Sequence, residues 1–171
     1  MSQIKIFDNF LSEETYDKIS KNIFSDKIPF YVTESTTNQG STDIYWLSHS
    51  IYNDFKPSSD LFIFMSEFFS KLNISSIINI RLNLVLKIPH TLIKTNYHTD
   101  YDNYQNLKTA IFYFNEDGTG TYFKINNDEK FIESKKNRMV VFDSNINHCG
   151  FLNNKFEKRF VLNFNFYQKN G

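Results

Sequence analysis

The stretch KRFVLNFNFY, residues 158–167, alternates between two sets of side chains. Successive side chains of a β-strand point to opposite faces of its sheet, so a period of two predicts a strand with two different faces. One face of this strand is large and apolar, and it consists of Phe160, Leu162, Phe164 and Phe166. The other face is less apolar, and it consists of Arg159, Val161, Asn163 and Asn165.

The same period recurs across the second half of the chain. Residues 77–88 alternate apolar and polar side chains, and from residue 108 onward short apolar segments are separated by turn residues at hairpin-like distances. Two helices are expected earlier, one over residues 12–24 with Ser12 as its N-cap, and one that starts at residue 59 or 60. Helices followed by many strands predict an α+β fold, with a two-sheet sandwich or jelly roll as the best interpretation.

Length and composition are those of a small soluble protein with one core. The 171 residues suit one domain over residues 1–171, and the 40% of hydrophobic and 18% of aromatic residues argue against disorder. The formal net charge is zero, so neither nucleic acid nor an anionic membrane is expected as a partner. The single cysteine excludes an internal disulfide, and the sequence has no long apolar run. A signal peptide is not expected, because the first residues lack a basic region followed by an apolar one. We therefore expect a cytoplasmic protein and leave its oligomeric state open.

A histidine and two aspartates lie together in NYHTDYDN, residues 96–103. In an extended segment the side chains at positions i and i+2 point the same way, so His98 and Asp100 can face one point, either as metal ligands or as polar groups at an exposed strand end. Asp102 shares their phase but lies one step further, and we place it beside such a site or at the surface. A metal needs a third ligand. The best candidate is His148, at the end of a strong strand, and its alternative is a hydrogen-bonded histidine in the core.

Two histidines and one carboxylate on one octahedral face are the ligand set of non-haem Fe(II) oxygenases. Arg159 strengthens this interpretation, because an arginine on the inward face of a strand is costly to bury without an anionic partner. A guanidinium binds a carboxylate through two parallel hydrogen bonds, so a small dicarboxylate ligand would supply that partner. The alternative for Arg159 is an ion pair at the surface.

The order of these segments resembles the Fe(II)/2-oxoglutarate-dependent dioxygenases, most closely their prolyl-hydroxylase-like branch. The resemblance rests on His98-x-Asp100 followed by TAIFYFNED, GTGTYF, RMVVFDSNINHCG and KRFVLNFNFY. It implies a double-stranded β-helix, which is a jelly roll, with supporting helices from the N-terminal half. It also implies Fe(II) as the cofactor and 2-oxoglutarate and O₂ as cosubstrates, with succinate and CO₂ released as a C–H bond of the substrate is oxidised.

Roles for individual residues are implied by the same resemblance. Arg159 would bind the distal carboxylate of 2-oxoglutarate, and the hydroxyl of Tyr113 would support that carboxylate. The Fe(II) ligands at the catalytic centre would be His98, Asp100 and His148. The cosubstrate pocket would also be lined by Asn163, Asn165 and Asn83.

Departures from the family pattern bear on the substrate. Ile88 stands where prolyl-hydroxylase relatives often carry a pocket tyrosine, and Asn165 stands where nucleic-acid repair relatives carry a second arginine. We expect hydroxylation of a peptide or protein side chain or of a small metabolite, and Asp100 favours this reaction over halogenation. The alternatives are demethylation or desaturation by the same chemistry and, in a different class, a non-catalytic jelly-roll binding module.

The polar, turn-rich segment over residues 33–60 is interpreted as a surface connection or a cover over the site, and we expect it to select the substrate. His49 and His90 are expected to form hydrogen bonds at the surface, and the alternative for His49 is a position that faces the substrate.

Overall fold

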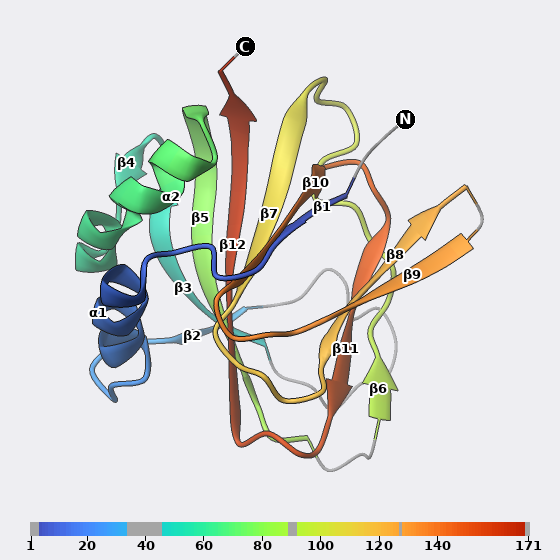
Figure 1. Cartoon of the computed structure of the whole chain (residues 1–171), viewed down its shortest axis with the longest axis horizontal. Coiled ribbons are helices and arrows are strands. Elements are labelled where there is room, and N and C mark those ends of the chain that lie inside the picture. The colour runs from blue at the N-terminus through green and yellow to red at the C-terminus, as the bar shows by residue number, and fades with distance from the viewer. Residues whose placement is uncertain (1–3, 34–45, 89–91, 127, 170–171) are drawn as a thin grey trace.

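The computed structural model describes residues 4–33, 46–88, 92–126 and 128–169. These residues form two antiparallel β-sheets, with helices packed on one of them, and the architecture is the double-stranded β-helix that the sequence predicted. In Figure 1 the helices lie to the left of the strands of the large sheet, and the strands of the small sheet lie to the right. None of the helices found among the described residues is long and apolar enough to cross a membrane.

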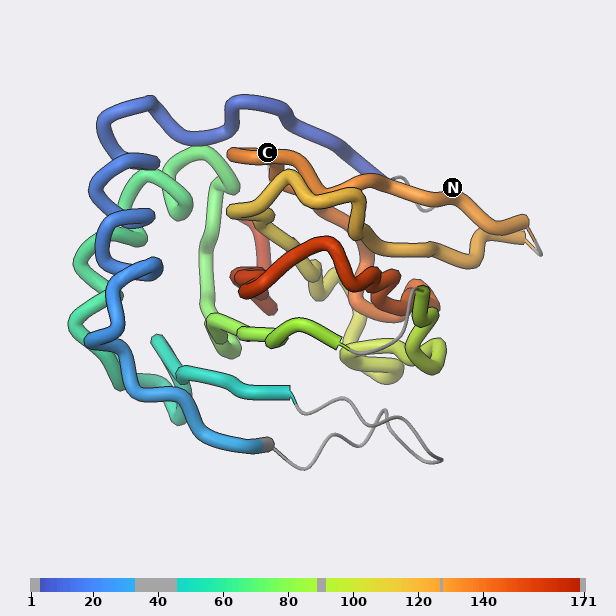
Figure 2. Tube along the Cα trace, turned by 90° about the horizontal axis from the view of Figure 1, so that it is seen from below, coloured from blue at the N-terminus to red at the C-terminus, as the bar shows by residue number. Residues whose placement is uncertain are grey.

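The large sheet has eight strands in the described part of the chain. Its order is β1, β10, β7, β12, β5, β3 and β2, with β4 paired to β3. Two long central strands are β12 (Lys158–Gln168) and β5 (Ile74–Leu86). The others are β1 (Lys5–Phe7), β2 (Tyr31–Thr33), β3 (Trp46–Asn53), β4 (Lys56–Pro57), β7 (Leu107–Tyr113) and β10 (Arg138–Asp143). The strand β1 pairs with β10 at the edge of this sheet, and Figure 2 shows the N-terminal segment, in blue, along that side of the molecule.

The small sheet has four strands in the order β6 (Leu92–Lys94), β11 (His148–Asn153), β8 (Gly120–Ile125) and β9 (Asp128–Glu133). Alternation along β8 turns Phe123, which is fully buried, toward the large sheet and turns Tyr122 outward onto the ring of Phe131. Gly120 lies under the same ring, and a Cβ at this position would approach a ring carbon of Phe131 to 2.6 Å. Glycine is therefore required where β8 and β9 come closest.

The outer face of the large sheet forms the main hydrophobic core with the helices α1 (Glu13–Ile23), η1 (Asp60–Met65) and α2 (Ser66–Lys71). Phe68 of α2 packs edge-on against Phe112 with ring centroids 5.1 Å apart, and it contacts Phe164 at 5.0 Å. All three rings are buried. The apolar set in β12 that the sequence analysis identified belongs to this core.

The inner face of the large sheet carries the other set of side chains. Cross-strand register places Asn165 of β12 directly opposite Thr109 on β7 and opposite Asn79 on β5. Residues directly opposite each other on antiparallel strands share a face. The next rows toward the other end of β12 are Ile111, Asn163 and Arg81, followed by Tyr113, Val161 and Asn83. The inner face is thus polar along β5 and β12.

The two predicted helices are present, with a difference in the second. Ser12 caps α1, and its hydroxyl accepts a hydrogen bond of 3.3 Å from the backbone N–H of Thr15. The second segment starts at Asp60 as expected, but its first turns are a 3₁₀ helix that becomes α-helical at Ser66.

Two expectations for the region before β5 were wrong. Residues 33–60 were interpreted as a surface connection or a cover over the site, but residues 46–53 within them form β3 and pair with β5 inside the large sheet. His49 was expected at the surface, but it is buried; its Nδ1 lies 2.8 Å from the carbonyl oxygen of Pro29 and its Nε2 lies 2.7 Å from Oγ of Ser59. Pairing with β5 makes β3 interior, because it turns alternate side chains toward the helices. Residues 34–45 and His90 lie outside the described residues.

Candidate metal centre

The side chains of His98, Asp100 and His148 converge on one point. Nε2 of His98 lies 4.0 Å from Oδ1 of Asp100, and Nε2 of His148 lies 3.9 Å from the same oxygen. The three ligand atoms all lie within 4.8 Å of one another, close enough to hold one metal ion. Among the described residues, this is the one group of three or more histidine, cysteine and acidic side chains with that property.

Backbone pairing brings the two histidines together. The N–H of His98 donates to the carbonyl oxygen of His148 at 3.0 Å, and the N–H of His148 donates to the carbonyl oxygen of His98 at 2.9 Å. The rings therefore lie on the same side, with centroids 4.4 Å apart. In each ring Nδ1 faces a backbone carbonyl, that of Asn96 or Ile146, which holds the proton on Nδ1 and leaves the lone pair of Nε2 directed at Asp100.

The two histidines differ in their surroundings. The side chain of His148 is 4% exposed and lies against the ring of Phe142 at 4.9 Å, whereas that of His98 is 32% exposed. Burial lowers the pKa of His148, although the carboxylate of Asp100 acts in the opposite direction. The imidazole is therefore neutral at pH 7, which is the form that binds a metal. The centre has one enclosed side and one side open to solvent, next to His98.

The carboxylate of Asp100 is held by two neighbours. Its Oδ2 accepts hydrogen bonds from the hydroxyl of Thr109 at 2.8 Å and from the amide of Asn165 at 2.9 Å. Its backbone N–H donates to the carbonyl oxygen of Ser144 at 3.1 Å. These contacts occupy one carboxylate oxygen and leave Oδ1, the atom nearest both histidines, for a cation.

Arg159 is buried on the inner face of the large sheet, with 3% of its surface exposed. Its Nε donates to the hydroxyl of Thr119 at 2.8 Å, and this hydroxyl donates in turn to Oδ1 of Asp117 at 2.5 Å. Within the described residues the guanidinium has no ion pair and no second hydrogen bond, so its two terminal nitrogens are left for a ligand. Burial lowers the pKa of Arg159, while the charge of Asp117 opposes this shift. A buried arginine nevertheless stays charged.

Tyr113 lies beside this guanidinium, but its hydroxyl has another partner. The Cζ of Arg159 is 5.9 Å from the centre of the Tyr113 ring, and the hydroxyl of Tyr113 lies 2.7 Å from that of Thr121. Burial raises the pKa of Tyr113, so the hydroxyl keeps its proton. Arg159, Tyr113, Thr119 and Thr121 thus form a polar cluster between the two sheets.

The three asparagines predicted for the pocket occupy different places. Asn165 contacts Asp100, as described above, so its position is at the carboxylate of the metal centre. Asn163 lies between Arg159 and Asn165 on the same face of β12, and its Oδ1 is buried without a hydrogen-bond partner among the described residues. Asn83 lies opposite Val161, at the same level as Tyr113, and is partly exposed.

The sequence analysis did not identify three threonines that contact the predicted site residues. Thr109 holds Asp100, Thr119 holds Arg159 and Thr121 holds Tyr113. Thr109 shares the phase of Tyr113 along β7, and Thr121 is inward by the alternation of β8, so the period of two contained this signal. The pairing of the strands, which decides what each threonine meets, is not readable from a single sequence.

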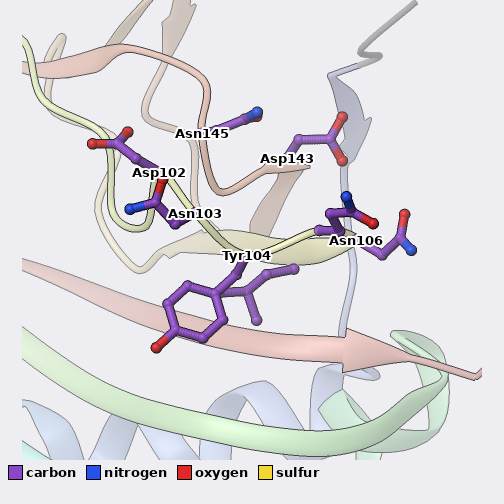
Figure 3. A pocket seen from close by; sticks show the side chains of 8 residues that line it. Asp102, Asn103, Tyr104, Asn106, Asp143 and Asn145 are labelled. Atoms are coloured by element: carbon purple, nitrogen blue, oxygen red, sulfur yellow. The ribbon is translucent and has the colours of Figure 1, made fainter.

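A separate hollow of about 490 Å³ lies at the loop that follows Asp100 in the chain. Figure 3 shows Asp102, Asn103 and Tyr104 on one side of it and Asp143 and Asn145 on the other. Asp102 lines this hollow, and its carboxylate accepts a hydrogen bond from the hydroxyl of Thr99. Residues 102–106 of the loop form most of the lining of the hollow, and Leu107 of β7, Asp143 of β10 and Asn145 complete it. None of these residues, Asp102 included, belongs to the group formed by His98, Asp100 and His148.

Solved structures show what this fold is similar to. A prolyl hydroxylase from Trichoplax adhaerens, in complex with a peptide fragment of a hypoxia inducible factor, matches 96% of this chain and 83% of its own, with a TM-score of 0.68 and 15% identity. An oxidoreductase of the 2OG-Fe(II) oxygenase family from Burkholderia pseudomallei matches 98% of this chain and 86% of its own, with a TM-score of 0.64 and 11% identity.

A third match is a non-haem, alpha-ketoglutarate-dependent epimerase of nogalamycin biosynthesis, which matches 98% of this chain and 78% of its own, with a TM-score of 0.68 and 8% identity. No family model and no curated protein matches the sequence. The chain therefore has the fold of the 2-oxoglutarate oxygenases, including that of their prolyl hydroxylases, and identities this low carry the likeness no further than the fold.

Proposed function

We propose that this protein is an Fe(II)- and 2-oxoglutarate-dependent dioxygenase that hydroxylates a C–H bond. With Fe(II), 2-oxoglutarate and O₂ bound, one oxygen atom would enter the substrate as a hydroxyl and the other would enter succinate, with release of CO₂. The chain's own residues would bind the ion and the cosubstrate, hold them in one orientation and exclude water from the buried side.

One observation carries this proposal: a buried guanidinium with no ion pair among the described residues shares the inner face of β12 with a residue that holds the candidate metal ligand Asp100. Leaving such a charge without an anion is costly. A dicarboxylate with one end at the metal centre and the other at Arg159 would remove this cost through two parallel hydrogen bonds. Tyr113 and Thr119 border the place where that carboxylate would lie.

The donor set fits the ion. Neutral imidazole nitrogens and a carboxylate oxygen on one side, with the other coordination positions open, suit non-haem Fe(II). The carbonyls behind both Nδ1 atoms orient the rings of His98 and His148, and Thr109 with Asn165 orients the carboxylate of Asp100. Phe123 and Phe142 pack against His148 and keep water from that side.

Other outcomes of the same chemistry are alternatives to hydroxylation. One solved structure of this fold is an epimerase, so the fold alone does not select the reaction. A product that is heavier than the substrate by one oxygen atom would identify hydroxylation; epimerisation leaves the mass unchanged and desaturation removes two hydrogens. A non-catalytic binding module would have no need of an intact ligand set, yet all three ligands and Arg159 are present.

The decisive experiment needs no substrate. Protein loaded anaerobically with Fe(II) and 2-oxoglutarate is exposed to O₂, and succinate is measured. We expect slow succinate formation that requires all three components and falls to background in Asp100→Ala. The matched control is Asp102→Ala, which removes the carboxylate of a residue that lies two positions away and lines the separate hollow; it should leave the rate unchanged. No succinate from the wild-type protein, or equal rates in the two variants, would contradict the proposal.

The substrate class is left between a peptide and a small metabolite. The Trichoplax prolyl hydroxylase was solved with a bound peptide, which favours a peptide by analogy of fold alone. Nucleic acid is not proposed, because the net charge is zero and Asn165, an uncharged residue, stands at the position where repair enzymes have a second arginine.

A further inference from the structure

The inner face of the large sheet continues beyond β12 onto β5, where it carries a second arginine. Arg81 lies directly opposite Asn163 of β12 and opposite Ser50 of β3. The alternate residues Ile80 and Leu82 belong to the core on the helix side, so Arg81 projects from the other face. Val85, which shares the phase of Arg81, packs against Leu152 of the small sheet and so confirms which way this face points.

Arg81 is one diagonal step from Asn165, the residue whose amide contacts Asp100 of the metal centre. The amide of Asn165 touches Asp100, and Asn79 stands directly opposite Asn165 on β5, with its own amide donating to the hydroxyl of Tyr101 at 2.9 Å. Side chains diagonal to each other on neighbouring strands start about 7–8 Å apart. An arginine side chain can span that distance, so its guanidinium can reach a molecule positioned over the open side of the centre.

Unlike Arg159, Arg81 is exposed to solvent. It makes no ion pair and no hydrogen bond with any residue that the structure describes. Its neighbours on the same face are uncharged: Asn79, Asn83, Asn163, Ser48 and Ser50. Two of them, Asn79 and Asn163, each have a buried Oδ1 without a hydrogen-bond partner among the described residues.

The charged groups expected at the metal centre would balance one another, so none of them would neutralise the charge of Arg81. The positive charges of Fe(II) and Arg159 would balance the negative charges of Asp100 and 2-oxoglutarate, and the histidines bind the ion as neutral rings. These groups therefore offer no anion to Arg81. A single exposed guanidinium beside a neutral site matches one negative charge.

We propose that Arg81 is a substrate-binding residue and that the substrate carries a carboxylate a few bonds from the carbon that is oxidised. This inference rests on the function proposed above. The planar guanidinium matches a carboxylate through two hydrogen bonds, whereas a phosphate dianion or a nucleic-acid backbone calls for several cations. The free carbonyl oxygens of Asn79 and Asn163 would accept hydrogen bonds from N–H or O–H groups of the same molecule.

The test compares matched probes. Protein loaded with Zn(II) and 2-oxoglutarate, which does not turn over, is titrated by calorimetry with a panel of N-acetyl amino acids and with the corresponding N-acetyl amino acid amides. We expect at least one acid to bind about tenfold or more tightly than its amide, because hydrogen bonds to charged groups are worth more than neutral ones. Arg81→Gln should abolish this difference, and Arg81→Lys should keep part of it.

Two controls separate the possible causes. Lys21→Gln removes an exposed charge from α1, on the helix side of the sheet, and should leave the preference for acids intact. The affinity for 2-oxoglutarate should be the same in Arg81→Gln as in the wild-type protein. A change in it would instead place Arg81 in the cosubstrate site and overturn the proposal.

The proposal would also be overturned if no acid of the panel bound more tightly than its amide, or if Arg81→Gln kept the preference. Failure of the proposed function looks different. In that case the wild-type protein would not bind 2-oxoglutarate with the metal, or would form no succinate, whatever residue stands at position 81.

Discussion

The two faces of the large sheet are built by the same alternation along the same strands but perform different tasks. On the outer face of β12, Phe160, Leu162, Phe164 and Phe166 are buried in the core formed with the helices. On the inner face, the structure describes one hydrogen bond of the buried Arg159 and no partner for the buried Oδ1 of Asn163 among the described residues. The side chains of the outer face pack against other residues of the chain. The inner face instead carries a charge and a polar atom with which a ligand would pair. We therefore expect substitutions on the outer face to change the stability of the protein and substitutions on the inner face to change ligand binding.

The largest effect should come from the outer face. Phe164→Ala removes a fully buried ring that packs on Phe68, and should lower the free energy of unfolding by about 3–5 kcal/mol. Its neighbour in sequence, Asn163, faces the other way, and no residue in the described part of the chain bonds its Oδ1, so Asn163→Ala should change stability little. Urea unfolding of both variants measures the difference. Equal losses would show that the two faces are not distinct in the way described.

On the inner face we expect a substitution to change ligand affinity more than the free energy of unfolding. Arg159→Met replaces a buried charge that forms no ion pair with any described residue by an apolar side chain of similar length, so the free energy of unfolding should stay the same or rise. The affinity for 2-oxoglutarate, measured by calorimetry with Zn(II) present, should fall by about 100-fold, because two charged hydrogen bonds are lost. An unfolding loss like that of Phe164→Ala, together with unchanged affinity, would make Arg159 a structural residue.

A smaller effect is expected where the inner face supports the metal ligand. Asn165→Ala removes one of two hydrogen bonds to Oδ2 of Asp100 and should weaken Co(II) binding by about 10–100-fold, the usual cost of losing a group that orients a ligand. Asn165→Asp keeps the size but places a negative charge beside the carboxylate, and Asn83→Ala on the same sheet face is the control. Competition with a chelator measures the affinities; equal values for Asn165→Ala and Asn83→Ala would contradict this role.

Much of this arrangement was predictable because it depends on local pattern. The period of two along residues 158–167 indicated both faces of β12, and the phase of Arg159 indicated that it points inward. His98 and Asp100 lie two apart in an extended segment, so their common direction followed from strand geometry. The double-stranded β-helix predicted by resemblance is confirmed by the topology of the sheets.

What sequence reasoning missed depends on pairing between distant segments. Register across β7 and β12 places the amide of Asn165 against Asp100, a contact that the period of two along β12 does not reveal. The strand β8 brings the hydroxyl of Thr121 to that of Tyr113, a pairing that the sequence did not indicate. The burial of His49 follows from the pairing of β3 with β5, which the polar and turn-rich composition of the region concealed. The roles of the site residues and the one-domain organisation stay predictions.

The most direct measurement is an anaerobic crystal structure with Mn(II), as a redox-stable substitute for Fe(II), and 2-oxoglutarate. The account predicts one anomalous scattering peak in contact with His98, Asp100 and His148, and a dicarboxylate whose distal end is paired with Arg159. An ion bound elsewhere in the chain, or a 2-oxoglutarate molecule that leaves Arg159 without a partner, would contradict it.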